Sequence, residues 1–136
     1  MANGSLKIVV TEGNRKGQKI LVFTGSLNIH TVFTFQAATR EETAEQVILD
    51  FTEVPFMDSA GLGSLVGAYV AAQRTHRKLA VAGANTQVKA LIDMTQVGTL
   101  IKCHENIAAA QRALGHTRES ELENWHKTSP QKLIRT

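Results

Sequence analysis

The sequence predicts a single α/β domain with a mixed sheet of four to five strands and about four packed helices. The 136-residue chain is long enough to bury one hydrophobic core. From Gln46 onward, short apolar runs alternate with helical patterns of about ten residues or more, which is typical of parallel β-α-β crossovers. Before Gln46, two strand-like runs are joined by a polar connection that contains glycine, and this pattern predicts an antiparallel hairpin.

The first half of the chain predicts three strands and one helix. Residues 11–17 are polar and contain Gly13 and Gly17, so they connect the first two strands. The third strand is almost continuous in apolar residues, as expected of a strand that is buried on both faces. The predicted elements are strands Leu6–Val10, Lys19–Thr24 and Val47–Phe51, and a helix over Thr31–Thr43 with Asn28 or Thr31 as its N-cap.

The second half of the chain continues the alternation of helices and strands. Apolar residues recur at intervals of three and four after Ala60, which indicates an amphipathic helix. Gly115 suits the C′ position of the last core helix. The predicted elements are helices Ala60–Thr75, Thr86–Met94 and Asn106–Leu114, with strands over Leu79–Ala82 and near Leu100–Cys103.

A change of composition after Gly115 divides the chain into a domain, residues 1–115, and a C-terminal tail, residues 116–136. The tail is rich in charged residues. Leu122 and Trp125 are three residues apart, a spacing that allows one short helical stripe. The tail is either a frayed end or a segment that packs Trp125 on a partner or on a second copy, as in a homodimer, because tryptophan often anchors interfaces.

Composition excludes several classes of function. The net charge is only +3, and the basic cluster at Arg74–Lys78 fits the solvated end of a helix better than a nucleic-acid surface, since interleaved aromatic residues are missing. The one cysteine, Cys103, fits a reducing compartment and a place in the core, because no spaced histidine completes a metal site. The chain has no signal peptide and no apolar stretch of about 20 residues, so we expect a cytoplasmic protein that does not enter a membrane.

The segment Val54–Ser64 carries the most information about function. It joins a predicted buried strand to a predicted helix, so the Ser59 hydroxyl is expected near the first free N–H groups of that helix. Such a position caps the helix and also suits an added phosphate, because the helix dipole favours negative charge. Gly61 and Gly63 give either close packing or access to Ser59, and Gly67 is expected to pack against the sheet. The segment therefore predicts a phosphorylation switch at Ser59 on a small binding domain.

Enzyme motifs are absent from this segment. Gly61, Gly63 and Gly67 come close to the dinucleotide-binding fingerprint, but the last glycine comes one residue late. Neither Ser59 nor Ser64 lies in the Gly-x-Ser-x-Gly pattern of a hydrolase. No phosphate-binding loop is visible, so binding of a nucleotide by the domain itself has little support. We expect no catalytic residue, no metal and no cofactor.

Four segments together are similar to the STAS domain of bacterial anti-sigma factor antagonists. The resemblance covers roughly Leu6 to Leu114, and Asp-Ser-x-Gly-Leu-Gly at residues 58–63 is its most specific part. The four segments follow the order of that family: residues 25–31, 47–51, 56–63 and 88–95. The resemblance implies a single STAS-type domain.

The resemblance also implies partner switching. In that family, the unphosphorylated antagonist binds an anti-sigma factor that is also a serine kinase, and the sigma factor is freed. The kinase phosphorylates the motif serine, here Ser59, and a phosphatase resets it. Asn28 stands where the family commonly carries Asp near this serine. The partner-binding residues implied are Asn28, Asp58, Ser59, Ala60, Gly61, Leu62 and Gly63.

A second interpretation keeps the same fold. The chain is then a STAS scaffold subunit of a larger stress-signalling or regulatory assembly and does not switch. A scaffold tolerates loss of the Ser59 hydroxyl and needs additional surface for assembly, for which the tail is the candidate.

Overall fold

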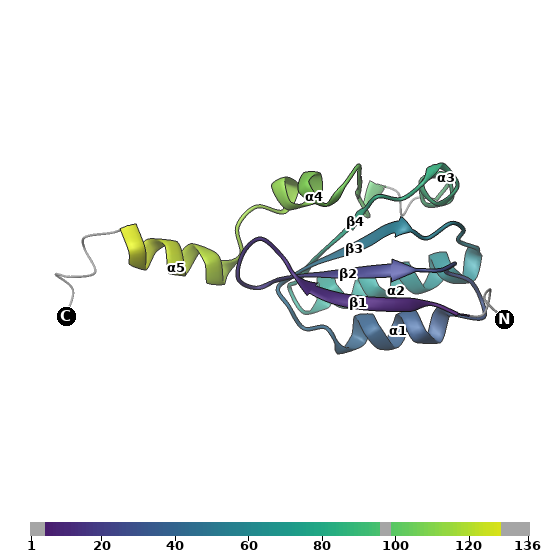
Figure 1. Ribbon diagram of the computed structural model, residues 1–136, viewed down its shortest axis with the longest axis horizontal. Helices are drawn as coiled ribbons and strands as arrows, with labels where there is room; N and C mark the ends of the chain where they lie inside the picture. Colours follow the sequence, from purple (N-terminus) through teal and green to yellow (C-terminus); the bar gives the residue numbers. More distant parts are fainter. Residues whose placement is uncertain (1–4, 96–98, 129–136) are drawn as a thin grey trace.

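The computed structural model describes residues 5–95 and 99–128, which form a five-stranded sheet with helices on both faces (Figure 1). The strand order is β1-β2-β3-β4-β5. Strand β1 runs antiparallel to β2, and the other neighbours are parallel. This mixed sheet confirms the predicted fold class and hairpin.

The observed elements lie close to the predicted ranges. The strands are β1 Lys7–Glu12, β2 Gln18–Thr24, β3 Gln46–Glu53, β4 Lys78–Ala82 and β5 Cys103–His104. The helices are α1 Val32–Glu41, α2 Ser59–Arg74, α3 Thr86–Asp93, α4 Ile107–Leu114 and α5 Arg118–Thr128. The last strand starts later than expected, because Ile101 is buried in the core without pairing and only Cys103 and His104 join the sheet.

The larger hydrophobic cluster lies between the sheet and helices α1, α2 and α3. At its centre, the rings of Phe23, Phe35 and Phe51 from β2, α1 and β3 pack with centroid separations of 5.2, 5.6 and 6.4 Å. Cys103 is half-buried against this cluster, so its expected place in the core is confirmed, and burial raises the pKa of its thiol. Gly67 does not pack on the sheet as expected, because it is exposed and a methyl group there would meet nothing.

Helix α4 covers the opposite face of the sheet, where a smaller cluster joins Ala110 to Ile20, Ile48 and Ala80. Beside it lies a buried pair of amide side chains. Gln18 Nε2 donates to Gln46 Oε1 at 2.8 Å, and both residues are fully buried at the first positions of β2 and β3. Gln46 Nε2 in turn donates to the Gly115 carbonyl at 3.1 Å. This pair joins the start of two strands to the end of α4.

Helix α5 extends from the domain at this same end of the sheet (Figure 1). Its base is fixed by Thr117, which is fully buried and whose hydroxyl donates to the Lys16 carbonyl. Thr117 and Ser120 cap one another, each backbone N–H donating to the other's hydroxyl at 2.9 Å. The Glu45 carboxylate accepts from the Arg118 N–H. The first turn of α5 is therefore attached to the domain rather than frayed.

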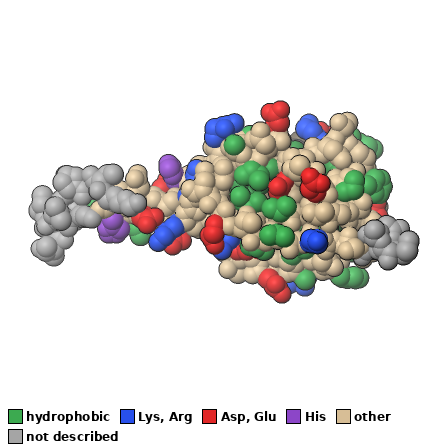
Figure 2. Space-filling view, viewed as in Figure 1, with side chains coloured by type: hydrophobic (Ala, Val, Ile, Leu, Met, Phe, Trp, Pro, Cys, Tyr) green, Lys and Arg blue, Asp and Glu red, His purple; other side chains and the backbone are tan. Residues whose placement is uncertain are grey.

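The body of α5 points into solvent, and the space-filling view shows charged and histidine side chains along it (Figure 2). Leu122 and Trp125 are both exposed on the helix. The predicted tail spans residues 116–136, and its last part, residues 129–136, lies outside the described part of the chain. Among the described helices, none is long and apolar enough to cross a membrane.

We predict that Gln46→Leu lowers the free energy of unfolding by about 1–3 kcal/mol, because the buried Gln18 Nε2 loses its acceptor, while the Gly115 carbonyl keeps the Arg15 guanidinium as a donor. Urea unfolding measures the change. Gln73→Leu is the control, since its amide bonds only the Tyr69 hydroxyl at the surface, and it should stay within about 0.5 kcal/mol of wild type. Equal stability of the Gln46 variant and the control would contradict the structural role of the amide pair.

Candidate functional site

Ser59 lies at the carboxyl end of the parallel strands, where ligands and partners commonly bind α/β sheets. Strand β3 ends at Glu53, residues 54–58 form a loop, and α2 begins at Ser59. The loop after β2, residues 25–31, lies beside it. The predicted strand-to-helix junction is confirmed.

The loop before Ser59 is hydrogen-bonded to the loop after β2. Leu27 and Met57 form a parallel bridge. The Leu27 N–H donates to the Phe56 carbonyl at 3.0 Å, and the Asp58 N–H donates to the Leu27 carbonyl at 3.2 Å. Both Leu27 and Met57 are buried. The backbone next to Ser59 therefore continues the sheet for one further step.

Helix α3 holds the same loop from the other side. Gln87 makes two hydrogen bonds to the Met57 backbone: its Oε1 accepts from the N–H at 3.1 Å and its Nε2 donates to the carbonyl at 3.0 Å. Asn85 Nδ2 donates to the Pro55 carbonyl at 3.1 Å. Analysis of the sequence missed Asn85 and Gln87, although Asn85 stands where a helix N-cap is expected. Together these contacts give the serine a fixed position.

Asp58, and not Ser59, caps helix α2. Its Oδ1 accepts from the Gly61 N–H at 2.9 Å, and its backbone has the extended conformation of an N-cap. Its Oδ2 accepts from the Ile29 N–H at 3.1 Å. The expected capping role of Ser59 is wrong, because the preceding carboxylate already occupies the position and also binds the neighbouring loop.

Ser59 is the first residue of α2 and is exposed. Its hydroxyl makes no hydrogen bond to any described residue. A side chain at this position is outside the cap and next to the N-terminal N–H groups of a 16-residue helix. The hydroxyl is thus available to another molecule, and its removal leaves no partner unsatisfied within the described structure.

Positions 61 and 63, shortly after Ser59, are glycine for different reasons. A methyl group on Gly61 would collide with the Leu27 carbonyl, so this residue is glycine because α2 and the loop after β2 approach closely. A methyl group on Gly63 would meet nothing within 4 Å. Gly63 is exposed, which is consistent with the expected access to the start of the helix, whereas Gly61 serves packing.

Asn28 lies in the neighbouring loop, directly before the residue whose N–H binds Asp58. Its Oδ1 accepts from the His30 N–H at 2.9 Å, which closes a local turn. Thr31 occupies the N-cap position of α1, and its hydroxyl accepts from the Asn28 N–H at 3.0 Å and donates to the Ser26 carbonyl at 2.9 Å. Asn28 is therefore next in the chain to the residue that binds Asp58, and its expected closeness to Ser59 stays a prediction.

Three large apolar side chains on these loops are exposed, and the sequence analysis did not single them out. Phe33 in the first turn of α1 is 77% exposed, Ile29 is 60% exposed and Phe56 is 46% exposed. Ile29 binds the Asp58 carboxylate through its N–H, and Phe56 binds Leu27 through its carbonyl, so all three belong to the two loops beside Ser59 or the helix they lead into. These exposed apolar side chains lie on segments that adjoin the start of α2, and they are candidates for contact with another molecule.

The seven predicted partner-binding residues differ in their exposure to solvent. Ser59 and Gly63 are exposed, while Asn28, Asp58 and Ala60 are half-buried at the surface. Gly61 is buried against Leu27, and Leu62 is part of the hydrophobic core. The first five are therefore accessible at the surface, whereas Gly61 and Leu62 are buried. No group of three or more His, Cys, Asp or Glu with the geometry of a metal site occurs among the described residues.

The sequence profile of the STAS domain matches residues 6–110. This chain belongs to the STAS domain family. The match spans β1 to α4 and includes the Asp58–Gly63 motif, while α5 lies outside it. The predicted family is confirmed.

Relatives of this STAS domain include regulators of sigma factors. An anti-sigma F factor antagonist of Paenibacillus polymyxa is 27% identical over 97 residues, which are 68% of this chain and 83% of that protein. An anti-sigma factor antagonist from Mycobacterium paratuberculosis has a similar crystal structure, with a TM-score of 0.72 and 17% identity over 82% of this chain and 96% of that one.

A further structural neighbour is SpoIIAA, a Bacillus cell fate determinant. Its unphosphorylated form has a TM-score of 0.63 and 18% identity, and covers 82% of this chain and 100% of its own. Its phosphorylated form has a TM-score of 0.55 and 16% identity, and covers 87% of this chain and 98% of its own. At these identities, the structural likeness shows the fold.

We predict opposite effects for two glycine substitutions in one helical turn. Gly61→Ala should lower the free energy of unfolding by about 1–3 kcal/mol, because the added methyl group pushes α2 away from the Leu27 carbonyl. Gly63→Ala should raise it by up to about 1 kcal/mol, because alanine favours the helix and the site is open. Urea unfolding of both variants measures these changes. A Gly61→Ala variant as stable as Gly63→Ala would show that the close approach of the loops is not required.

Proposed function

We propose that this STAS domain is an anti-sigma factor antagonist that binds an anti-sigma factor serine kinase and is released when Ser59 is phosphorylated. The observation that carries the proposal is the state of Ser59. It is exposed, its hydroxyl is unbonded among the described residues, and its backbone is held by two neighbouring segments. The names of the sequence relatives support the first part of the proposal, and the existence of SpoIIAA in two phosphorylation states supports the second.

The position of Ser59 suits a kinase substrate. A kinase must reach the hydroxyl and align it with the phosphate donor, and Gly63 leaves the adjacent surface open. In the transfer, the Ser59 oxygen takes the γ-phosphoryl group of ATP and ADP leaves. The general base of the kinase accepts the hydroxyl proton. Since Ser59 bonds no described residue, modification breaks no internal hydrogen bond, so the domain should stay folded.

Phosphorylation should weaken binding through desolvation and charge. The phosphate adds about −1.5 to −2 charges beside the Asp58 carboxylate. The loop after β2, the first turn of α1 and the loop before Ser59 expose Ile29, Phe33 and Phe56 in turn, and these side chains favour an apolar contact. A partner that covers this surface would bury the new charge, and a loss of only about 3 kcal/mol weakens binding more than a hundredfold.

The proposal makes the chain a binding module and a substrate rather than an enzyme. The two partners it requires are the kinase and a phosphatase that restores the Ser59 hydroxyl. It requires no metal or cofactor in the STAS domain, and no nucleic acid or membrane contact by this chain. The neighbouring carboxylate, Asp58, accepts from the Gly61 and Ile29 N–H groups and makes no hydrogen bond to the Ser59 hydroxyl.

We predict that Ser59→Ala retains an anti-sigma factor kinase and Ser59→Asp loses it. The alanine keeps a small uncharged side chain, and the aspartate adds charge where the partner would cover it. Paired baits carrying these substitutions are exposed to lysate of the source cells and the bound proteins are identified by mass spectrometry. The purified kinase with ATP should then add the mass of one phosphate to wild type and none to Ser59→Ala.

Circular dichroism of both variants is the control for this experiment, because each should fold like wild type. The same partners on both baits would contradict the switch. An unfolded Ser59→Asp protein would also contradict it, since the serine would then be structural.

We further predict that Phe33→Ala weakens binding of the kinase by at least about tenfold, since a large exposed aromatic side chain at an interface often contributes more than 1.4 kcal/mol. The fold should be unchanged. Val70→Ala is the matched control, because Val70 is also exposed on a helix but lies 11 residues, or about three turns, beyond Ser59. Titration of the purified kinase measures both affinities. Equal losses for the two variants would exclude a specific role of Phe33.

The second candidate function is a scaffold subunit that does not switch. The observation that favours it is α5, which lies outside the STAS match, is attached to the domain by Thr117 and Arg118, and exposes Leu122 and Trp125. Such a helix could hold a partner or a second copy whatever the state of Ser59. Retention of the same assembly by both Ser59 baits, together with its loss after Trp125→Ala, would select this function.

A further inference from the structure

Strand β4 has an open edge next to the short strand β5. Strand β5 pairs only with Val81 and Ala82 of β4. The first three residues of β4, Lys78–Ala80, are paired with β3 on one side and with no described strand on the other. The Val81 N–H points toward β5, where it donates to the Lys102 carbonyl at 3.4 Å. Because hydrogen-bonding direction alternates along a strand, the Leu79 N–H points toward the same open side.

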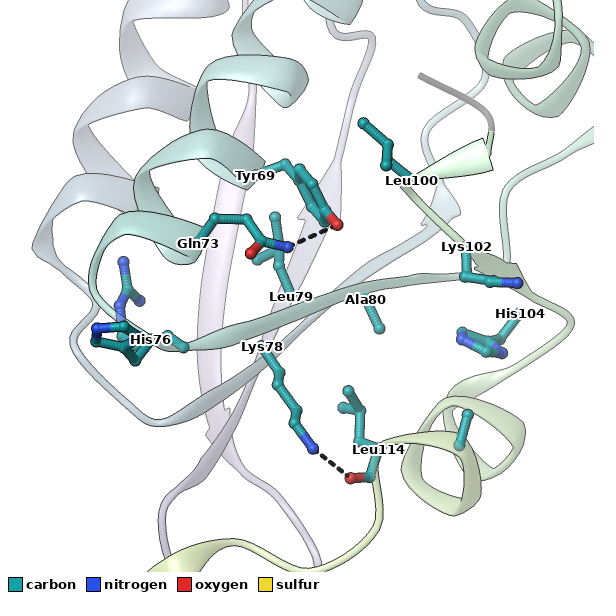
Figure 3. Close-up of a pocket in the computed structure, with 12 residues that line it drawn as sticks. Tyr69, Gln73, His76, Lys78, Leu79, Ala80, Leu100, Lys102, His104 and Leu114 are labelled. Atoms are coloured by element: carbon teal, nitrogen blue, oxygen red, sulfur yellow. Dashed lines mark hydrogen bonds between the residues drawn. The ribbon is translucent and has the colours of Figure 1, made fainter. Parts of the chain in front are cut away.

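A groove of about 580 Å³ runs along this open edge. Figure 3 shows Tyr69 and Gln73 of α2 on one side, Leu114 at the end of α4 on another, and Lys102 and His104 of the β5 segment across the opening. The groove therefore lies between two helices at the place where a longer β5 would run.

The groove is cationic. None of the described residues that line it is Asp or Glu, while Lys78, Lys102 and His104 all line it. Arg77 also lines it, but its guanidinium is bound to the Glu42 carbonyl at 2.9 Å and to the Thr75 hydroxyl. Lys78 makes a single bond of 3.5 Å to the Leu114 carbonyl, which is weak enough to be exchanged for a carboxylate.

The two faces of the open edge differ. Leu79 packs toward the larger hydrophobic cluster, on the side of Tyr69. Ala80 belongs to the smaller cluster under α4, and the alternation along a strand puts Lys78 on that same face. His104 is level with Ala82 in the parallel register, and Lys102 follows the same alternation. One face is therefore apolar and the other carries the cations.

We propose that the open edge of β4 receives an extended acidic segment of a partner protein. The segment adds a strand beside Lys78–Ala80, and its backbone bonds the Leu79 N–H. Alternate Asp or Glu side chains then lie beside Lys78, Lys102 and His104, while the residues between them face Tyr69 and Leu79. This is strand addition, in which backbone bonds give affinity and alternate side chains give specificity. It is independent of Ser59, which lies at the end of α2 opposite to Gln73.

The test uses the full chain and a short blocked peptide of alternating glutamate and valine, labelled for fluorescence anisotropy. We expect saturable binding that weakens as salt screens the charges. A peptide with lysine in place of glutamate should not bind, and a peptide interrupted by proline should bind at least about tenfold more weakly, because proline cannot complete the backbone ladder. On adding the acidic peptide, the Leu79 amide should exchange more slowly with solvent.

Charge reversal gives the matched variants. Lys102→Glu should weaken binding of the acidic peptide at least about tenfold, since repulsion replaces attraction. Lys7→Glu makes the same change on β1, at the opposite edge of the sheet, and should leave binding close to wild type. Equal effects of the two variants would overturn the proposal, because binding would then follow net charge alone.

Three other outcomes would also overturn it. One outcome is binding of the peptide with unchanged exchange of the Leu79 amide, which would show that the contact does not involve the strand edge. A single-stranded RNA could bind this groove more tightly than the peptide and protect no amide, which would make it a nucleic-acid surface. A second copy of the chain could protect Leu79 without any peptide, with a concentration-dependent mass in sedimentation, which would make the edge a self-association surface.

Discussion

The contact between the loops that follow β2 and β3 is the constraint on which the site depends. Leu27 and Met57 continue the parallel pairing of the sheet beyond its regular strands, and Asp58, in the loop after β3, bonds the loop after β2 through its backbone N–H and its carboxylate. This single residue ends one loop, begins α2 and fixes the neighbouring loop. Gly61 is required because the contact leaves no room for a side chain. The backbone that leads to Ser59 is therefore held by the loop after β2 on one side and by Gln87 of α3 on the other.

The backbone that precedes Ser59 is fixed by neighbouring segments, while the Ser59 side chain forms no hydrogen bond with a described residue. This combination suits the modification proposed for Ser59. The backbone fixes where the hydroxyl is, so a partner can recognise it without first ordering a loop. The side chain bonds no described residue, so changing it alters the surface and leaves the packing of α2 intact. Stability and recognition are thereby assigned to adjacent residues: Asp58 stabilises the fold, and Ser59 remains available for chemistry.

The sequence predicted the order and type of the elements because their apolar patterns are local. It also placed the Asp58–Gly63 motif at a strand-to-helix junction. It could not choose the cap, since Asp and Ser are both good N-caps, and the choice depends on the Ile29 N–H from a distant segment. The local sequence does not show that Phe33 is exposed, because only Val32 and Phe35 of α1 are buried and which face is covered depends on where α2 packs.

Longer-range contacts between polar residues were the least predictable. Gln18 and Gln46 are 28 residues apart, and nothing in their local sequence distinguishes them from solvated strand ends. Asn85 and Gln87 were expected only to begin a helix, and their bonds to residues 55 and 57 depend on the order of the strands. Such contacts become visible only when the topology has brought the segments together.

The attachment of α5 has a spatial consequence. Its base is bound to Lys16 and Glu45, which lie just before β2 and β3, whereas Ser59 follows the last residues of β3 at the other end of the sheet. The seven residues of β2 separate the two ends by roughly 20 Å at about 3.3 Å per residue. A molecule that gripped α5 would leave the serine uncovered. The sheet therefore separates a contact made at α5 from the proposed modification at Ser59, so that under this proposal one need not block the other.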